Sequence, residues 1–239
     1  MIWNGLHRIV ERLDALVFPP RCRLCGAVTG GDDGLCAGCL TDLPWAVGGC
    51  PRCARSLPNG TSAELCGRCL RKPPAFDAAT ALLRYHPPVD YLIQRLKFSG
   101  ELAIAPLLAR QLIRKIAERT DPLPERLIPV PLHYTRLRER GFNQSTELAR
   151  QLSRWLRIPV QHKLCRRIRF TPPQSLAPPA ARRRNLHRAF RVEGRLCAEH
   201  VAIIDDVLTT GHTASELAGV LRQAGARFVE VWIIARSGQ

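Results

Sequence analysis

The stretch Val201–Ser215 reads V-A-I-I-D-D-V-L-T-T-G-H-T-A-S and contains a strand, a loop and the start of a helix. Val201–Asp205 predicts a buried strand that brings two carboxylates, Asp205 and Asp206, to its end. A short threonine and glycine loop follows, and Thr213–Gln223 then has the apolar spacing of a helix. Ligands of parallel α/β sheets bind at the carboxyl ends of strands, so this junction predicts a binding site.

The residues of the junction suit a sugar phosphate. The carboxylates of Asp205 and Asp206 can accept hydrogen bonds from the vicinal hydroxyls of a sugar. Gly211 permits close approach of the backbone, and the N–H groups of such a loop, with the N-terminus of the next helix, bind phosphate. We therefore expect the loop to bind phosphate through Thr209, Thr210, Gly211, His212 and Thr213.

Apolar runs and helical spacing alternate along the rest of the second half of the chain. This alternation predicts an α/β fold with a mostly parallel sheet covered by helices on both faces. Cys165–Arg188 has many arginines, four prolines and little periodicity, and it is expected to form a loop or hood. The expected strands are Ala78–Tyr85, Arg126–Val130, Val201–Asp205 and Phe228–Ala235, and the expected helices are Val89–Phe98, Leu102–Arg119, Asn143–Leu156 and Thr213–Gln223.

Eight of the ten cysteines form four C-x2-C pairs within residues 22–69. One such pair is a weak signal, but two pairs supply the four thiolates of a tetrahedral zinc site. The segment is also an internal repeat, because ten or twelve residues separate the pairs of each unit. The expected zinc ligands are Cys22, Cys25, Cys36 and Cys39 in the first unit, and Cys50, Cys53, Cys66 and Cys69 in the second.

The zinc in these sites is expected to be structural, since four protein thiolates leave no open position for a catalytic water. One or two ions fit the pattern, and the pairs can be joined sequentially or cross-braced. Disulfides are the weaker interpretation, because no secretory signal precedes the cysteines. Cys165 and Cys197 stand alone and are expected to be ordinary buried thiols.

The first residues predict an amphipathic helix rather than a signal peptide. Apolar residues recur at helical spacing between Ile2 and Val17, and Arg8, Glu11, Arg12 and Asp14 interrupt any apolar core. The sequence has no stretch that approaches the ~20 apolar residues of a membrane-spanning helix. We therefore expect a cytoplasmic protein without a transmembrane segment.

The chain is strongly basic, with a formal net charge of +16. Residues 136–195 hold 16 Lys and Arg against 3 Asp and Glu, which gives +13 in one quarter of the chain. Such a concentration indicates an anionic partner, either a phosphorylated substrate or nucleic acid. Trp155, Phe170 and Phe190 lie in or near this segment and are candidates for stacking on single-stranded DNA.

The strand–loop–helix junction resembles the phosphoribosyl pyrophosphate motif of type I phosphoribosyltransferases. In that family four apolar residues precede two acidic residues and an apolar-x-T-T-G-x-T loop, and Val201–Thr213 fits throughout, with His212 at a variable position that has no expected catalytic role. Over nearly its whole length the chain resembles the ComF family. The further segments that carry this resemblance are the cysteine pairs, Leu96-Lys97-Phe98-x-Gly100, Pro129-Val130-Pro131, Arg140-Gly141-Phe142-Asn143-Gln144, Gln174-Ser175-Leu176, Arg184-Asn185 and Ala189-Phe190.

The resemblance implies two parts: an N-terminal helix with a zinc module over residues 1–72, and a type I phosphoribosyltransferase domain over residues 73–239. It implies binding of phosphoribosyl pyrophosphate with Mg²⁺, a link to natural transformation, and competence proteins as partners. Asp205 and Asp206 would be the catalytic residues. Leu132–Asn143 is the expected pyrophosphate loop, with Arg140 as its principal contact, and Arg166–Arg184 is the expected lid. The acceptor of the phosphoribosyl group does not follow from the sequence.

Three functions are compatible with these patterns. The first is an enzyme that transfers a phosphoribosyl group to an unidentified acceptor. The second is a single-stranded DNA-binding competence factor that uses the fold as a scaffold without turnover. The third is a zinc-stabilised interaction protein that senses phosphoribosyl pyrophosphate. The two aspartates and the complete loop favour ligand binding, because a scaffold alone does not need both carboxylates.

Overall fold

The computed structural model describes residues 19–30, 34–57, 64–169, 189–196 and 198–238. The chain forms two compact units, Met1–Leu43 and Pro44–Gln239. The first unit contains the first two cysteine pairs and the short helix α2 (Ala37–Thr41). The second contains the other two pairs together with the α/β fold. The expected N-terminal helix lies outside the described residues.

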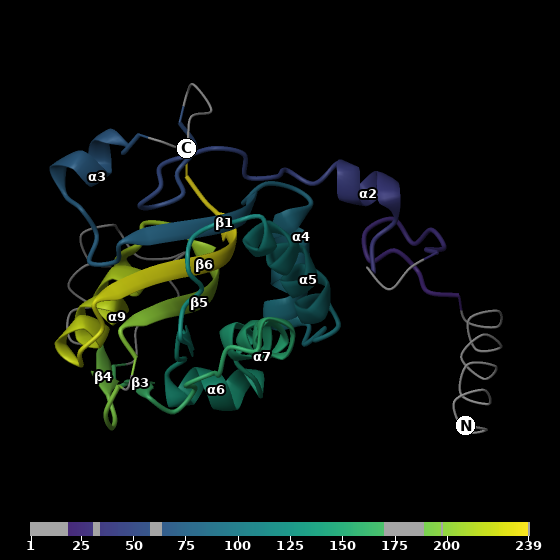
Figure 1. Ribbon diagram of the computed structural model, residues 1–239. Coiled ribbons are helices and arrows are strands. Elements are labelled where there is room, and N and C mark those ends of the chain that lie inside the picture. The colour runs from purple at the N-terminus through teal and green to yellow at the C-terminus, as the bar shows by residue number, and fades with distance from the viewer. Residues whose placement is uncertain (1–18, 31–33, 58–63, 170–188, 197, 239) are drawn as a thin grey trace, which may run out of the picture. The chain divides into compact units, whose positions relative to one another are not determined.

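The second unit is built on one parallel sheet of four strands in the order β1-β6-β5-β2 (Figure 1). The strands β5 and β6 are buried along most of their length, which explains their continuous apolar runs. The bounds are Ala78–Arg84 for β1, Arg126–Pro129 for β2, His200–Leu208 for β5 and Phe228–Arg236 for β6. Each expected strand is present.

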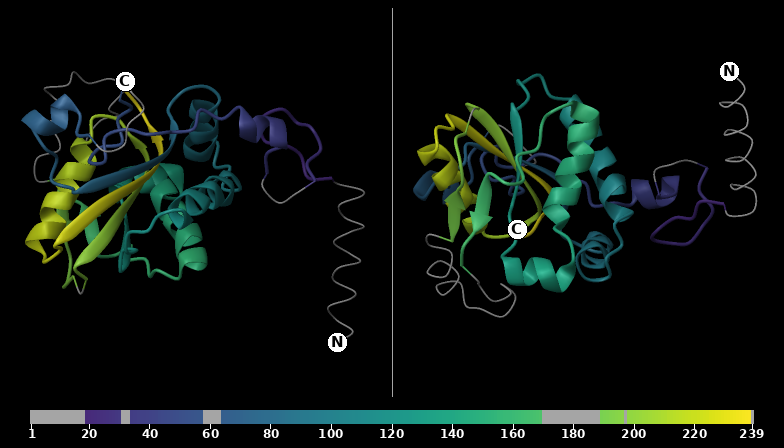
Figure 2. Two further views of the ribbon diagram at one scale, coloured as in Figure 1. Left: turned by 45° about the horizontal axis from the view of Figure 1, so that its top comes forward. Right: turned by 90° about the horizontal axis from the view of Figure 1, so that it is seen from below.

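Helices cover both faces of this sheet, as Figure 2 shows. On one face α9 (His212–Gln223) buries Ala214, Leu217 and Leu221 against β5 and β6. On the other face lie α4 (Val89–Phe98), α5 (Ile104–Ala117) and α7 (Gln144–Leu156). The predicted α/β class with a parallel sheet flanked by helices is therefore confirmed. Within the described residues, no helix combines the length and the apolar character needed to cross a membrane.

Five short elements among the described residues were not expected from the sequence. They are α2, α3 (Gly67–Arg71), α6 (Tyr134–Arg140), β3 (Cys165–Arg167) and β4 (Phe190–Val192), of which the last two pair in an antiparallel ladder. The expected pyrophosphate loop Leu132–Asn143 is thus mostly the helix α6. This helix has no buried residue, so it leaves no apolar periodicity in the sequence. His133 caps its first turn, and Gly141, at φ 81°, ends it in the left-handed conformation.

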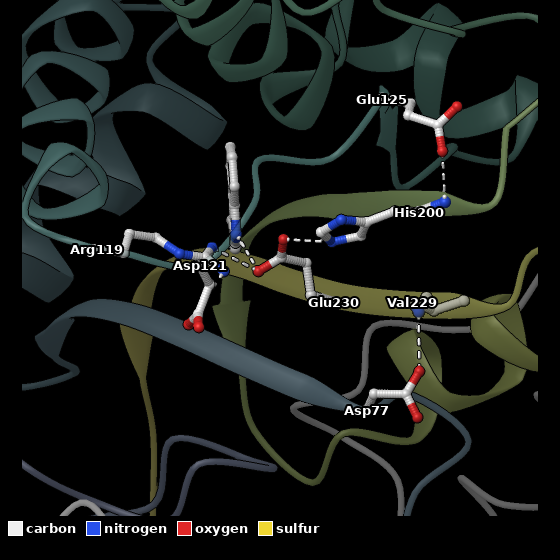
Figure 3. A network of polar contacts seen from close by, with 8 residues as sticks. Asp77, Arg119, Asp121, Glu125, His200, Val229 and Glu230 are labelled. Atoms are coloured by element: carbon white, nitrogen blue, oxygen red, sulfur yellow. Dashed lines mark hydrogen bonds and ion pairs between the residues drawn. The ribbon is translucent and has the colours of Figure 1, made fainter.

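A buried carboxylate near the amino ends of the strands holds three donors together (Figure 3). Glu230 on β6 is 1% exposed and accepts hydrogen bonds from Arg119 Nη1 at 2.7 Å and Trp232 Nε1 at 2.7 Å. The imidazole of His200 lies 2.8 Å from its other oxygen. The strand register pairs Glu230 with Ala202, three residues before Asp205 on β5. The cluster therefore stabilises the sheet away from the candidate ligand site.

Replacing Glu230 with alanine should reduce the free energy of unfolding by about 3–5 kcal/mol. The largely buried guanidinium of Arg119 and the indole N–H of Trp232 both lose their acceptor. The measurement is urea unfolding in zinc-containing buffer. Glu193→Ala is the matched control. This carboxylate is 42% exposed and pairs with Arg166, so its loss should cost less than about 1 kcal/mol. Equal losses for both variants would show that the Glu230 cluster does not stabilise the fold.

Candidate functional site

The loop that follows β5 turns sharply at Gly211 into the helix α9. Gly211 has φ 78° and forms the N-cap of α9. A Cβ atom at this position would meet the Phe76 ring at 3.8 Å, an ordinary contact, so the glycine is needed for its backbone angle rather than for space. Thr209 is exposed, and Thr210, His212 and Thr213 are partly exposed.

Asp205 and Asp206 lie side by side at the end of β5, and α7 contacts both. Ser145 Oγ donates to Asp205 Oδ1 at 2.9 Å, and Gln144 Nε2 donates to Asp206 Oδ1 at 3.2 Å. The second oxygen of Asp206 forms an ion pair with Lys97 Nζ of α4. Asp206 is 3% exposed, whereas Asp205 is half-buried. Residues from two helices, α4 and α7, therefore hold the carboxylate pair.

The two carboxyl groups have different proton affinities. Burial, together with the neighbouring charge of Asp206, raises the pKa of Asp205 to about 7. Burial acts in the same direction on Asp206, but the Lys97 ammonium and the Gln144 amide outweigh it and lower the pKa of Asp206 below its ordinary value. At neutral pH, Asp206 is ionised and Asp205 is close to its midpoint.

The aspartates and the loop line a cavity of about 390 Å³. Four cations, Lys97, Arg136, Arg140 and Arg167, share its wall with the two carboxylates, so the lining carries an excess of at least two positive charges. Burial lowers the pKa values of Arg140 and Arg167, and repulsion from Arg136 adds to this effect. Each guanidinium nevertheless stays protonated at neutral pH, because arginine titrates far above it. The cavity is suited to a ligand that carries phosphate groups and hydroxyls.

Arg140 reaches the cavity through the junction of α6 and α7. Its Nη1 donates to Gln144 Oε1 at 2.5 Å, and its guanidinium lies 5.4 Å from the centre of the Phe98 ring. The next residues fix the junction: Asn143 caps α7 through the N–H of Ser145 at 3.0 Å and donates from Nδ2 to the carbonyl of Val130 at 3.0 Å. Arg140, Gln144 and Asp206 thus form one chain of contacts.

The eight cysteines form two groups, and each group joins two consecutive pairs. One group contains Cys22, Cys25, Cys36 and Cys39, and the other contains Cys50, Cys53, Cys66 and Cys69, with all sulfur atoms of a group within 4.8 Å of one another. The pairing is therefore sequential rather than cross-braced. All nine cysteines in the described part of the chain are free thiols, including the buried Cys165; Cys197 lies outside it.

The spacing of the sulfur atoms fits zinc. Four sulfurs at ~2.3 Å from a tetrahedral ion lie roughly 3.8 Å apart. The Sγ atoms of Cys25 and Cys36 are 3.7 Å apart, and those of Cys53 and Cys66 are also 3.7 Å apart. These distances are too long for a disulfide and match a shared ion. Burial and the neighbouring Cys53 raise the pKa of Cys69, so zinc must displace a tightly held proton there.

Sequence reasoning missed several residues of the site. Lys97, Gln144 and Ser145 precede the aspartates by 60 residues or more, and only the segments that resemble the ComF family pointed to the first two, without a role. Of the expected lid, the described residues 166–169 include Arg167, which lines the cavity. Phe190 is 4% exposed and cannot stack on DNA, so that expectation was wrong. Trp155 is 64% exposed, and Phe170 lies outside the described residues.

These features define a class: an α/β protein with a parallel sheet and two zinc-ribbon-type sites of four cysteines. A family model described as a double zinc ribbon domain matches residues 13–70. The DNA utilization protein YhgH of Escherichia coli (strain K12) is 39% identical over 227 residues, 93% of this chain and 99% of that protein. Competence protein F of Haemophilus influenzae is 37% identical over 231 residues, 92% of this chain and 98% of that protein. The chain belongs to the ComF family.

The carboxyl group of Asp205 should titrate with a midpoint near pH 7, whereas the midpoint of Asp206 should lie below the ordinary value of an aspartate. Carbon-13 NMR of aspartate-labelled protein measures both midpoints. In the Asp206→Asn variant, the midpoint of Asp205 should fall, because the repelling charge is removed and Lys97 is free to pair with Asp205. A wild-type midpoint near 4 for Asp205 would contradict the electrostatic account of the site.

Proposed function

We propose that this protein binds phosphoribosyl pyrophosphate with Mg²⁺ in the cavity at the carboxyl end of β5, and that it acts in DNA uptake as a phosphoribosyltransferase-like protein. The observation that carries this proposal is the position of Asp205 and Asp206 beside the loop Thr209–Thr213, in one cavity with four cations. Two adjacent carboxylates suit a vicinal diol, and a glycine-containing turn at a helix N-terminus suits a phosphate.

The cavity offers a separate place for each part of the ligand. The ribose hydroxyls would donate to Asp205 and Asp206, and the 5-phosphate would accept from the loop and the N-terminus of α9. The pyrophosphate would lie toward Arg140 and its cationic neighbours. Mg²⁺ would be held largely by the ligand and by water, because it keeps much of its hydration shell, with Asp205 and Asp206 as the carboxylates within the same cavity, and it would supply positive charge to neutralise the pyrophosphate.

In a transfer reaction, the bond between the anomeric carbon and the pyrophosphate oxygen breaks and a bond to the acceptor nucleophile forms. Positive charge then develops on the ribose, and negative charge leaves with the pyrophosphate. Asp205 and Asp206 stabilise the first charge, and Arg136, Arg140 and Arg167 stabilise the second. The residues of this chain thus contribute by positioning and charge neutralisation.

A second candidate function is binding of single-stranded DNA, for which a second groove, adjacent to the aspartate cavity, is the specific observation. This groove, of about 1020 Å³, lies between β3, β4 and the helices α6 and α7. Its arginines and lysine are Arg150, Lys163, Arg166, Arg167 and Arg191, of which Arg167 also lines the aspartate cavity, and its acidic residues are Glu147 and Glu193. Tyr134, which is 67% exposed, lies on its wall. Proteins bind single-stranded DNA through basic side chains that contact the phosphates and through exposed aromatic rings that stack on the bases. The relatives named for DNA utilization and competence support this function.

Calorimetric titration of phosphoribosyl pyrophosphate and Mg²⁺ into zinc-loaded protein should give saturable binding. The variant Asp205→Asn/Asp206→Asn should weaken it by roughly 100-fold or more, because it loses two charge-assisted contacts. The control variant Asp42→Asn/Asp121→Asn carries the same charge change at two exposed aspartates and should bind like the wild type. Absence of binding by folded wild-type protein would reject the ligand and leave single-stranded DNA as the principal partner.

Two single variants separate the two candidate ligands. Asp206→Asn should weaken binding of phosphoribosyl pyrophosphate and leave salt-dependent binding of single-stranded DNA nearly unchanged. Lys163→Gln should do the reverse, with a small loss of DNA affinity and a shallower salt dependence, because one phosphate contact is removed. Fluorescence anisotropy at several salt concentrations measures the affinity for single-stranded DNA and its salt dependence. If Asp206→Asn abolishes both activities in folded protein, the two-surface description is wrong.

A further inference from the structure

We infer that the second cysteine cluster positions the proposed phosphate-binding loop Thr209–Thr213. Two arginines that contact or belong to this cluster orient the backbone of the loop. Arg236 and Arg68 are the positioning residues in this arrangement. Neither touches the cavity that holds the aspartates. The inference rests on the proposed function where it concerns ligand affinity, whereas the effect on the loop itself can be measured without a ligand.

Arg236, at the end of β6, is a buried arginine that joins the loop to the cluster. Its side chain is 6% exposed, and its Nη1 donates to the carbonyls of Leu208 at 2.7 Å and Thr209 at 2.5 Å. Its Nε donates to the carbonyl of Cys53 at 2.8 Å. A single planar guanidinium therefore connects a zinc ligand to the first two peptide groups of the loop.

Arg68 contacts the next peptide group from the zinc ribbon itself. It lies on α3, between the ligands Cys66 and Cys69, and its Nη2 donates to the carbonyl of Thr210 at 2.7 Å. The same part of the chain also reaches the start of α9, where the N–H of Ala75 donates to Ser215 Oγ at 2.9 Å. Three consecutive loop carbonyls, those of residues 208, 209 and 210, are thus held by two guanidinium groups.

Because the peptide bond is planar, the direction of each held carbonyl also fixes the direction of the N–H group of the next residue. In a trans peptide, the carbonyl of one residue and the N–H of the next point in opposite directions. Because the carbonyls of Leu208, Thr209 and Thr210 face the arginines, the N–H groups of Thr209, Thr210 and Gly211 point away from them. N–H groups presented together in this way form an anion-binding nest.

The cavities on the two sides of the loop agree with this orientation. Arg68, Arg236 and Cys53 line a cavity of about 510 Å³ on one side. Asp205 and Asp206 line the cavity of about 390 Å³ on the other. Thr210 and Gly211 border both, so the loop is a thin wall whose backbone is fixed from the zinc side and open to the ligand side. Fixing a binding group from behind is what gives such a site its precision.

The experiment combines hydrogen exchange of the loop amides with ligand titration in zinc-loaded protein. Arg68→Gln should speed exchange of the 209–213 amides and weaken phosphoribosyl pyrophosphate binding by roughly tenfold, the value of one charged hydrogen bond. Arg71→Gln is the matched control, since it makes the same charge change on the same helix at an exposed position, and it should change neither quantity. Arg236→Lys keeps the charge but loses the fork, and it should have a larger effect than Arg68→Gln.

A second pair of variants tests the cluster. Cys53→Ser and Cys25→Ser each remove one thiolate at the equivalent position of the two units, and zinc analysis of each should show the loss of one ion. Only Cys53→Ser should speed loop exchange and weaken binding. Loop exchange that is unchanged in folded Arg68→Gln and Arg236→Lys proteins would overturn the inference. Absence of wild-type binding, with faster loop exchange in the variants, would overturn the proposed ligand and support the positioning role.

Discussion

Placing two carboxylates at the end of a buried strand is the constraint on which the other features of this site depend. Asp205 and Asp206 repel each other, and burial removes the water that would otherwise solvate their charge. Lys97 forms an ion pair with Asp206, and Gln144 and Ser145 in the first turn of α7 donate hydrogen bonds to the two carboxylates. These contacts offset the repulsion and the loss of water. These contacts fix the positions of α4 and α7 relative to β5, so the helical layer and the site are determined together.

Lys97 neutralises the charge of Asp206 but not that of Asp205, and this difference has a chemical consequence. Lys97 contacts Asp206, whereas Asp205 accepts, within the described part of the chain, only from neutral donors, the Ser145 hydroxyl and the N–H of Asp206, and has a raised pKa. A carboxyl group near its midpoint at neutral pH responds strongly to an incoming cation or to a hydroxyl donor. Binding of the proposed ligand would therefore be coupled to ionisation of Asp205.

The parts of the molecule that depend on local patterns could be predicted from the sequence. The apolar run before Asp205 predicted β5, and repeated cysteine spacing predicted eight metal ligands, because both signals lie within a few residues. The pairing of the cysteine units, the helix α6 and the partners of the aspartates could not be predicted in this way. Lys97 is separated from Asp206 by more than 100 residues, and α6 buries no side chain that would mark it by periodicity.

The same limit applies to the residues behind the loop. Nothing in the residues next to Arg236 distinguishes it from the many exposed arginines of this basic chain, yet within the described residues it is the only arginine that is buried. A buried guanidinium must find acceptors, and loop carbonyls that face away from an anion are suitable ones. Arg236 does not line the aspartate cavity, and the carbonyls of Leu208 and Thr209 accept its hydrogen bonds. Each group thus supplies the partner that the other needs. These hydrogen bonds give the second cysteine cluster a physical reason to lie against the loop that follows β5.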